Sequence, residues 1–348
     1  MKRLSCLAAL ATALLVLEDG LQACSTFCIR LGDGTFVGRN YDFEIGDGMV
    51  MENPAGLRKK GFEKGGPSWA AQYGSVTFNQ FGRDHPMGGM NEAALVVELM
   101  WLDETRYPAN DARLPLGVLE WIQYQLDTAA TVADVIDSNQ KVRISDVAPL
   151  HYLVSDASGR TATIEFLDGK LVAHTGDTLP VPVLTNSTYK TSLKFMESRR
   201  GRVPSGSGSP ERFARAAALV GALQRSGTDR PVASLFEVLA DVAQSNTRWS
   251  IVYDQTGRVI HFRTDAHRPV RYLSMKTLGF TCAEGARLLD IDTRVEGDVS
   301  KKLKPYSTAA NLAFITRTYA ASSVTRRTPA TEVAAIAAHP ETAACRAY

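Results

Sequence analysis

Alternation of apolar and polar positions predicts three antiparallel hairpins along the chain. In residues 24–43, two segments rich in β-forming residues flank an Asp-Gly turn, which is a strong hairpin signal. In residues 161–175, apolar residues alternate with Thr and Glu before a second Asp-Gly turn. A third hairpin is expected over residues 249–263. The chain is therefore expected to build its core on antiparallel sheets.

Apolar residues at helical spacing predict helices in separate blocks of the chain. Residues 235–242 carry apolar residues at positions i, i+3, i+4 and i+7, and Ser234 with Glu237 has the form of a capping box in front of them. The remaining helices are expected over residues 116–126, 131–139 and 212–225, the last with Ser209 as its cap. Pro210 suits the first turn of that last helix, because its fixed φ is already helical.

Strands and helices are grouped in blocks and do not alternate as βαβ units. This order predicts a layered α+β domain and argues against a doubly wound parallel sheet. The sequence contains no G-x-G-x-x-G motif, no P-loop and no internal repeat. The Ala/Thr-rich residues 308–348 have a weak pattern and are expected to form a weakly specified tail of the same domain.

The N-terminus has the layout of a secretory signal peptide. Two basic residues precede an apolar stretch at 4–17, which is too short to span a bilayer, and a polar segment ending at Ala23 follows. Removal of residues 1–23 would leave a periplasmic or secreted protein, a single domain over residues 24–348 that begins with Cys24. The alternative is a lipoprotein signal, which would make the chain a lipid-anchored binding protein with Cys24 lipidated and no catalysis.

Composition and charge narrow the possible partners. A chain of 348 residues with 45% hydrophobic residues can bury a large core. Its 39 Lys and Arg against 37 Asp and Glu give a net charge of +2, and no basic run supports a nucleic-acid partner. The histidines and cysteines lack metal-binding spacing, so neither a metal nor another cofactor is expected. Cys282 and Cys345 are expected to be two thiols, with a disulfide between them as the alternative.

A cysteine made N-terminal by processing combines a nucleophile and a base in one residue. Its thiol has a reference pKa of about 8.5 and its α-amine one of about 8, so the amine can take the thiol proton at neutral pH. Arg39 near the sulfur would stabilise the thiolate, and Asp42 would hold the amine. Residues three apart on a strand face opposite sides, so their joint use requires a bulge. The alternative is an ion pair between them at the surface of an edge strand.

Five motifs in a fixed order point to one family. They are Cys24-Ser25-Thr26-Phe27 at the processing site, Gly38-Arg39-Asn40-Tyr41-Asp42, residues 89–95 (GMNEAAL), Leu184-Thr185-Asn186 and residues 209–213 (SPERF). With them, the chain from residue 24 to about 280 resembles the choloylglycine hydrolase family of linear amide hydrolases. These are N-terminal-nucleophile (Ntn) enzymes and include bile salt hydrolases and penicillin V acylases.

The resemblance implies an αββα four-layer sandwich of two antiparallel sheets between helical layers. It also implies a small-molecule amide substrate and a homotetramer. Cys24 would be nucleophile and base, Arg39 and Asp42 would tune it, Asn186 would donate a hydrogen bond to the oxyanion, and Arg212 would complete the charged shell. Early in its predicted helix, Arg212 opposes the helix dipole by about 0.3–1 kcal/mol, so other contacts should hold it.

The chain departs from the bile salt hydrolase pattern at one position. Ten residues after Asn91, where those enzymes have an asparagine, this sequence has Trp101. We expect Met100, Trp101 and Leu102 to line an apolar or aromatic acyl pocket; the alternative for Met100 and Leu102 is an ordinary core strand. This feature resembles the penicillin V acylase and acyl-homoserine-lactone acylase branch more than the bile salt enzymes.

Overall fold

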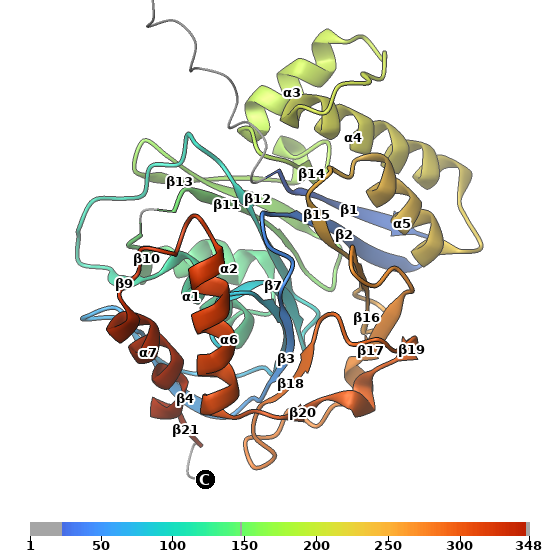
Figure 1. Ribbon diagram of the computed structural model, residues 1–348. Helices are drawn as coiled ribbons and strands as arrows, with labels where there is room; N and C mark the ends of the chain where they lie inside the picture. The colour runs from blue at the N-terminus through green and yellow to red at the C-terminus, as the bar shows by residue number, and fades with distance from the viewer. Residues whose placement is uncertain (1–22, 147, 346–348) are drawn as a thin grey trace, which may run out of the picture.

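Two large sheets stacked face to face form the centre of the protein (Figure 1). The computed structural model describes residues 23–146 and 148–345, so the predicted signal peptide lies outside the described residues except for Ala23. One sheet has seven strands, in the order β14 (Val183–Leu184), β1 (Ser25–Leu31), β2 (Gly34–Asp42), β15 (Thr247–Asp254), β16 (Val259–Thr264), β17 (Arg271–Ser274) and β19 (Gly297–Asp298). Neighbouring strands are antiparallel, apart from the parallel pair β17–β19.

The second large sheet has nine strands, each antiparallel to its neighbours. Their order is β13 (Lys170–Thr175), β12 (Thr161–Leu167), β11 (Leu150–Ser155), β8 (Val96–Trp101), β7 (Pro86–Asn91), β6 (Ser75–Asn79), β3 (Met49–Asn53), β18 (Arg287–Asp290) and β20 (Lys304–Pro305). Two small sheets lie outside it: β9 (Leu114–Leu116) with β10 (Val142–Ile144), and β21 (Ala344–Cys345) with β4 (Leu57–Lys60) and β5 (Ser68–Ala70).

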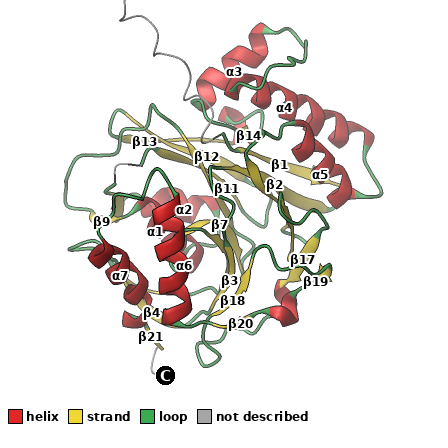
Figure 2. Cartoon of the chain, in the orientation of Figure 1, coloured by secondary structure: helices red, strands yellow, loops and turns green. Residues whose placement is uncertain are grey.

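Helices cover the outer faces of both large sheets, which completes the predicted αββα sandwich (Figure 2). Against the nine-stranded sheet lie α1 (Val118–Thr128) and α2 (Val132–Ser138); against the seven-stranded sheet lie α4 (Ser209–Ser226) and α5 (Pro231–Asp241), with α3 (Tyr189–Ser198) beside α4. Near the C-terminus, α6 (Thr308–Ala321) packs against α7 (Ala330–Ala338). Short 3₁₀ helices lie at Gly176–Thr178, Met275–Thr277, Ser300–Lys302 and His339–Thr342.

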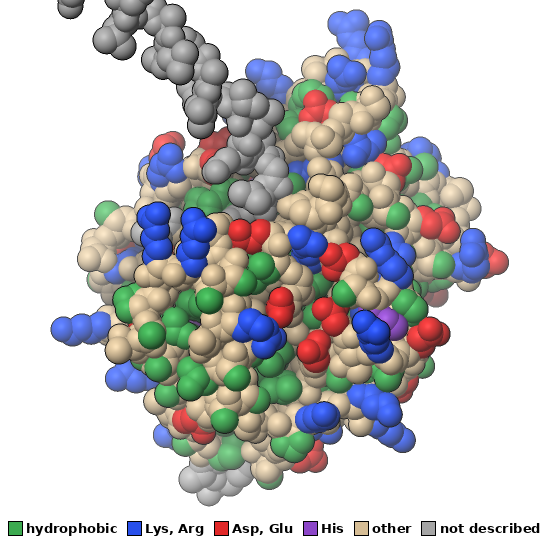
Figure 3. Space-filling view, in the orientation of Figure 1, with side chains coloured by type: hydrophobic (Ala, Val, Ile, Leu, Met, Phe, Trp, Pro, Cys, Tyr) green, Lys and Arg blue, Asp and Glu red, His purple; other side chains and the backbone are tan. Residues whose placement is uncertain are grey.

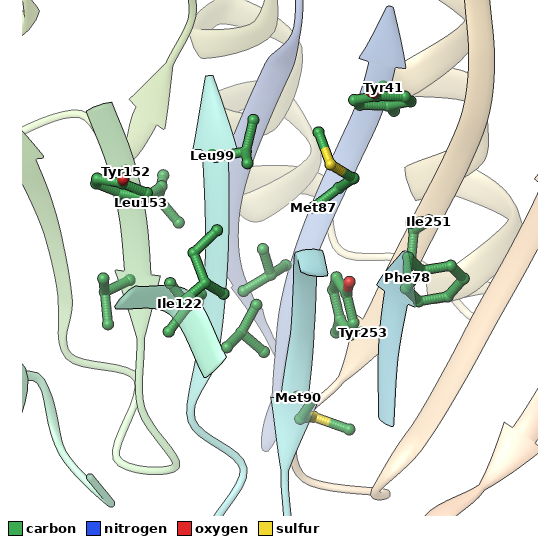
Figure 4. Close-up of a cluster of buried hydrophobic side chains, with 14 of the residues drawn as sticks. Tyr41, Phe78, Met87, Met90, Leu99, Ile122, Tyr152, Leu153, Ile251 and Tyr253 are labelled. Carbon is green, nitrogen blue, oxygen red and sulfur yellow. The ribbon is translucent and has the colours of Figure 1, made fainter. Parts of the chain in front are cut away.

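Apolar side chains from the facing sheets meet between them, as Figure 4 shows. Phe78 and Leu99 of the nine-stranded sheet and Ile251 and Tyr253 of the seven-stranded sheet are buried there, and Phe78 meets Tyr253 edge-on with ring centroids 6.2 Å apart. A strand covered on one face by helices and on the other by a second sheet has no face left for water, and β1, β2 and β11 are buried along almost their whole length. This double burial holds the start of β1 rigidly at the centre of the molecule.

The three predicted hairpins are confirmed as β1–β2, β12–β13 and β15–β16. The predicted helices also form, but two starts differ from expectation. Helix α5 begins at Pro231, three residues before Ser234, so the expected capping box does not form and the Ser234 hydroxyl contacts Thr228 at 2.9 Å instead. Helix α4 is capped by Gly208 rather than Ser209, whose hydroxyl is used elsewhere.

The C-terminal residues are better ordered than their composition predicted. From residue 308 to 345 they form α6, α7 and β21, and β21 pairs with β4. Cys282 and Cys345 form a disulfide with their Cα atoms 5.7 Å apart, so the expectation of two thiols was wrong. The pairing joins residues 63 positions apart, a proximity that only the tertiary fold of residues 308–345 creates. Cys24 and Cys28 are the free cysteines among the described residues.

The disulfide should stabilise the fold measurably. Closing a loop of 63 residues removes chain entropy from the unfolded state, worth up to about 4 kcal/mol. A variant carrying Cys282→Ser and Cys345→Ser should lose up to that amount of unfolding free energy in a urea titration. Reductant should destabilise the wild type and leave the double variant unchanged. Equal stability of the two proteins under oxidising conditions would contradict the prediction.

Charged side chains are mixed over the surface. On the face in Figure 3, Lys and Arg lie among Asp and Glu, as the small net charge predicts. None of the helices in the described ranges is both long and apolar enough to cross a membrane.

Candidate active site

Cys24 lies directly before β1 and lines a cavity with mainly apolar walls. Strand β1 pairs with β2 so that Ser25 faces Asn40, which brings Cys24 beside the end of β2. The Cys24 side chain is buried, and its Sγ lies 3.9 Å from Nη2 of Arg39 and 4.0 Å from the carbonyl oxygen of Asp42. The hairpin thus places the thiol next to the two residues predicted to tune it.

A bulge in β15 lies opposite Asp42, at the end of β2. The pairing of β15 with β2 shifts register between Thr247 and Trp249, opposite the end of β2 that carries Asp42. Oδ1 of Asp42 accepts a hydrogen bond from the Thr247 hydroxyl at 2.5 Å. Oδ2 of Asp42 is buried without a hydrogen-bond partner in the described part of the chain. The irregularity therefore lies in the partner strand β15 and not between Arg39 and Asp42 of β2.

Arg212 reaches from helix α4 to the start of β1. Its Nη1 donates to the carbonyl oxygens of Ala23 (3.1 Å) and Cys24 (2.7 Å) and to the Ser25 hydroxyl (2.7 Å). Its Nη2 donates to Oδ1 of Asn186 at 2.9 Å. These contacts are the ones expected to offset the unfavourable helix dipole. Arg215, one turn along, forms an ion pair with Asp241 at the surface.

Asn186 lies just after β14 and is anchored on three sides. Its Nδ2 donates to the carbonyl oxygen of Trp101 at 3.0 Å, and its Oδ1 accepts from Arg212. Its backbone N–H donates to the hydroxyl of Ser209 at 2.9 Å, which explains why that serine does not cap α4. An amide NH₂ has two hydrogens, so one donor of Asn186 is left after the bond to Trp101.

Strand alternation separates the residues predicted to bind substrate. Trp101 and Leu99 face the cavity, and the indole N–H of Trp101 donates to Asp103 at 2.6 Å. Met100 points to the opposite side of β8, where it is fully buried and its sulfur lies 2.9 Å from the Thr26 hydroxyl. The structure thus places Met100 in the core, the alternative left open from the sequence, because successive side chains of a strand face opposite sides. Leu102 is also buried away from the cavity.

The cavity above Cys24 has a volume of about 370 Å³ and mainly apolar walls. Several aromatic side chains line it: Tyr41, Phe43, Phe62, Phe81, Trp101 and Tyr319. Carboxyl groups are also at its walls, among them Asp42 and Glu63, and none of the described residues lining it is Lys or Arg. The size and lining fit a small organic molecule with an apolar part.

Comparison with known proteins identifies the family. The model of the family described as linear amide C–N hydrolases, choloylglycine hydrolase family, matches residues 24–205, more than half of the chain. The chain belongs to the choloylglycine hydrolase family. It is thus a hydrolase of carbon–nitrogen bonds in linear amides, with the Ntn-hydrolase fold that the sequence predicted.

Relatives within the choloylglycine hydrolase family support this assignment. A penicillin V acylase from Pectobacterium atrosepticum is 27% identical over 292 residues, covering 68% of this chain and 77% of that protein. The structure of penicillin V acylase from Agrobacterium tumefaciens has a TM-score of 0.73 and 27% identity, covering 82% of this chain and 98% of that one. A mutant conjugated bile acid hydrolase from Clostridium perfringens shares the fold, with a TM-score of 0.67, 16% identity and coverage of 79% and 98%.

Sequence reasoning missed one charged residue of this family member's site. Glu98 on β8 is fully buried and forms an ion pair with Arg39; it also accepts a hydrogen bond from the Tyr253 hydroxyl. Gly88 on β7 leaves room for its carboxylate, which a Cβ there would strike. A single Glu in the apolar run VVELMW was the available signal. A charged residue buried in such a strand needs a partner of opposite charge, so an ion pair could have been predicted.

Arg39 is held as a permanent cation beside the thiol. Its Nη1 also donates to the Met87 carbonyl oxygen (2.5 Å) and its Nη2 to that of Leu99 (3.2 Å). Burial acts to lower the pKa of Arg39, but the negative charges of Glu98 and the Cys24 thiolate raise it above its ordinary value. Burial raises the pKa of the Cys24 thiol, and Arg39 opposes that rise. With Ala23 attached, the thiol is therefore protonated at neutral pH.

Asp42 should make the stability of the uncleaved chain depend on pH. Burial raises its pKa from 3.8 to about 7, against the opposing effects of Thr247, Arg212 and Arg39. The folded chain then binds this proton more tightly than the unfolded chain, so the unfolding free energy should fall as pH rises from about 4 to about 7. Asp42→Asn cannot lose a proton and should remove this part of the pH dependence.

Urea titrations of the uncleaved chain across that pH range would measure the effect. Asp33→Asn, at an exposed residue of the turn between β1 and β2, is the control and should keep the wild-type slope. If Asp42→Asn also keeps the wild-type slope, Asp42 is not the group that titrates.

Proposed function

We propose that the mature protein begins with Cys24 and cleaves a linear amide through a thioester on that residue. The chain is a linear amide hydrolase by its family, and Cys24 is the free thiol at its cavity. Removal of residues 1–23 would convert the peptide nitrogen of Cys24 into an amine, a base carried by the nucleophilic residue itself.

The unpartnered oxygen of Asp42 is the observation that carries this proposal. Oδ2 is buried without a partner in the described residues, and burying a carboxylate oxygen in that state is costly. A positive α-ammonium group on Cys24 would give it one. Asp42 lies beside Cys24 in space, since its carbonyl oxygen is 4.0 Å from the sulfur and its charge acts on the thiol. The site is thus complementary to the processed N-terminus.

The proposed reaction has two stages, acylation of Cys24 and hydrolysis of the resulting thioester. The α-amine accepts the thiol proton, and the thiolate, stabilised by Arg39, attacks the amide carbon. The oxyanion accepts a hydrogen bond from the remaining side-chain N–H of Asn186. The α-ammonium then gives its proton to the leaving amine. The same amine then removes a proton from water, which attacks the thioester and releases the carboxylic acid.

An aromatic or apolar acyl group fits the cavity best. Trp101 and three phenylalanines line the cavity that Cys24 also lines, and their rings would offer apolar surface to an acyl group bound there. We therefore propose a penicillin V acylase-like or acyl-homoserine-lactone acylase-like substrate, with conjugated bile salts as the third candidate. The relatives at 27% identity are penicillin V acylases.

Export is part of the proposal. The N-terminal pattern is that of a signal peptide, and the disulfide between Cys282 and Cys345 is of the kind that persists in oxidising compartments. We propose a periplasmic or secreted enzyme that assembles as a homotetramer, which light scattering of the purified protein would measure. The rival is a lipid-anchored binding protein, in which an acylated Cys24 nitrogen could not act as a base.

Mass spectrometry of the protein isolated from its exported fraction tests the mechanism. Edman sequencing should begin at Cys24, and trapping with a slowly hydrolysed amide should add one acyl group to that residue. A lipid-modified N-terminus, or an acyl group on another residue, would overturn the proposal.

A further inference from the structure

One wall of the catalytic cavity is built by the C-terminal segment, residues 308–345. In Figure 1, α6 and α7 of this segment lie side by side. The segment's cavity-lining residues are Tyr319, Val324, Thr325, Thr328, Glu332 and Ile336. The family match ends at residue 205, so this wall lies outside the part of the chain by which the family is recognised.

The segment is fastened next to the catalytic strand. Glu44, two residues after Asp42, accepts hydrogen bonds from the hydroxyls of Ser322 (2.6 Å) and Ser323 (3.1 Å), at the end of α6. Arg317 donates to Asp47 at 2.9 Å. The loop after α6 is thereby tied to the chain that leaves the active site.

A second set of contacts holds the far end of the segment. His339 lies 2.8 Å from the carbonyl oxygen of Lys60, and its ring meets Phe62 edge-on at 5.2 Å; Phe62 itself lines the cavity. Beyond it, β21 pairs with β4, and the disulfide of Cys345 closes the segment covalently. With both ends attached, the wall has a fixed position relative to Cys24.

Three side chains give this wall its apolar surface: Tyr319, Ile336 and Val324, the last of which is 46% exposed. Tyr319 and Ile336 are 9% and 7% exposed, so each is packed from behind and presents little more than its cavity face. Tyr319 meets Phe81, another cavity residue, edge-on with centroids 5.5 Å apart. A rigid apolar wall limits the length of a chain that the cavity can hold, because core packing yields little to an extra methylene.

We propose that the C-terminal segment is a specificity-determining element, in which Tyr319 and Ile336 limit how far an apolar acyl chain extends from Cys24. The inference rests on the proposed function, since it takes Cys24 as the point of attachment. On this inference, a segment outside the family match selects among acyl groups.

A series of straight-chain fatty acyl p-nitroanilides, from acetyl to dodecanoyl, would test this on the mature enzyme. Ile336→Ala and Tyr319→Ala should raise the ratio of kcat/KM for the longest to that for the shortest substrate by about tenfold or more, the scale that a methylene in an apolar pocket sets. Ile336→Trp should lower the same ratio.

Val333→Ala is the matched control, because Val333 is buried on the same helix without lining the cavity. Val333→Ala should keep the wild-type chain-length profile. Thermal melts would check that each variant is folded. Unchanged profiles in both Ile336 variants would overturn the inference.

Failure of the proposed function has a different signature. If no anilide is cleaved, the affinity for dodecanamide, an uncharged probe, can be measured by calorimetry and tests the wall without catalysis. Ile336→Ala should then tighten binding and Ile336→Trp should weaken it. Equal affinity in both variants would overturn the inference independently of catalysis.

Discussion

Cys24→Ala should lower kcat/KM for amide hydrolysis by roughly 10⁴-fold or more, the loss typical of removing a catalytic nucleophile. Without the sulfur no thioester forms, and the donors around the site have nothing to stabilise. The fold should survive, because alanine fills most of the same buried space at the start of β1. Rates on a penicillin V-type amide, with the N-terminus of each preparation sequenced, would measure the effect.

Cys28→Ala provides the matched control for this variant. Cys28 is the other free, buried cysteine, on the same strand, and its sulfur lies 3.4 Å from the Ser155 hydroxyl, away from the cavity lining. Its replacement should cost packing energy of about 1 kcal/mol and leave kcat/KM within a few-fold of wild type. Equal losses in both variants, or activity retained in Cys24→Ala, would contradict a Cys24 thioester.

The sequence predicted the fold where the pattern was local. The hairpins β1–β2, β12–β13 and β15–β16 combine period-two patterns with short turns, so neighbouring residues carry the information. The helix starts were less accurate, since Ser209 is drawn away from capping by Asn186, a contact across the fold. The order of the sheets and the disulfide depend on pairings far apart in sequence, which no local pattern contains.

The site was predictable to the extent that its motifs were recognisable. Cys24, Arg39, Asp42, Asn186 and Arg212 form a connected cluster, linked by the thiol contact of Arg39 and the hydrogen bonds of Arg212. The alternation of β8 explains why Trp101 faces the cavity while its neighbour in sequence does not.

Two further parts of the site depend on the tertiary fold. The ion pair of Glu98 with Arg39 could not be predicted from the sequence, because the two residues meet only when the two sheets pack face to face. The C-terminal wall escaped notice because weakly patterned helices are stabilised by what they pack against rather than by their own sequence.

Arg212→Lys should lower kcat by about 10²–10³-fold, the cost of a misplaced oxyanion donor. The guanidinium bridges the start of β1 to Asn186 through two different nitrogens, so it fixes the position of Asn186 relative to Cys24. A lysine ammonium has a single nitrogen and cannot span both partners. Because Arg212 acts through the position of Asn186, the loss should appear in kcat more than in KM.

Arg215→Lys is the control for this substitution. It lies one turn further along α4, in a surface ion pair with Asp241, where exchange of one cation for another costs little. Its kcat should stay within about twofold of wild type. If Arg212→Lys were as active as Arg215→Lys, the position of Asn186 would not depend on the bridge, and the positioning role of Arg212 would be wrong. If both lost activity together with thermal stability, α4 as a whole and not the bridge would be responsible.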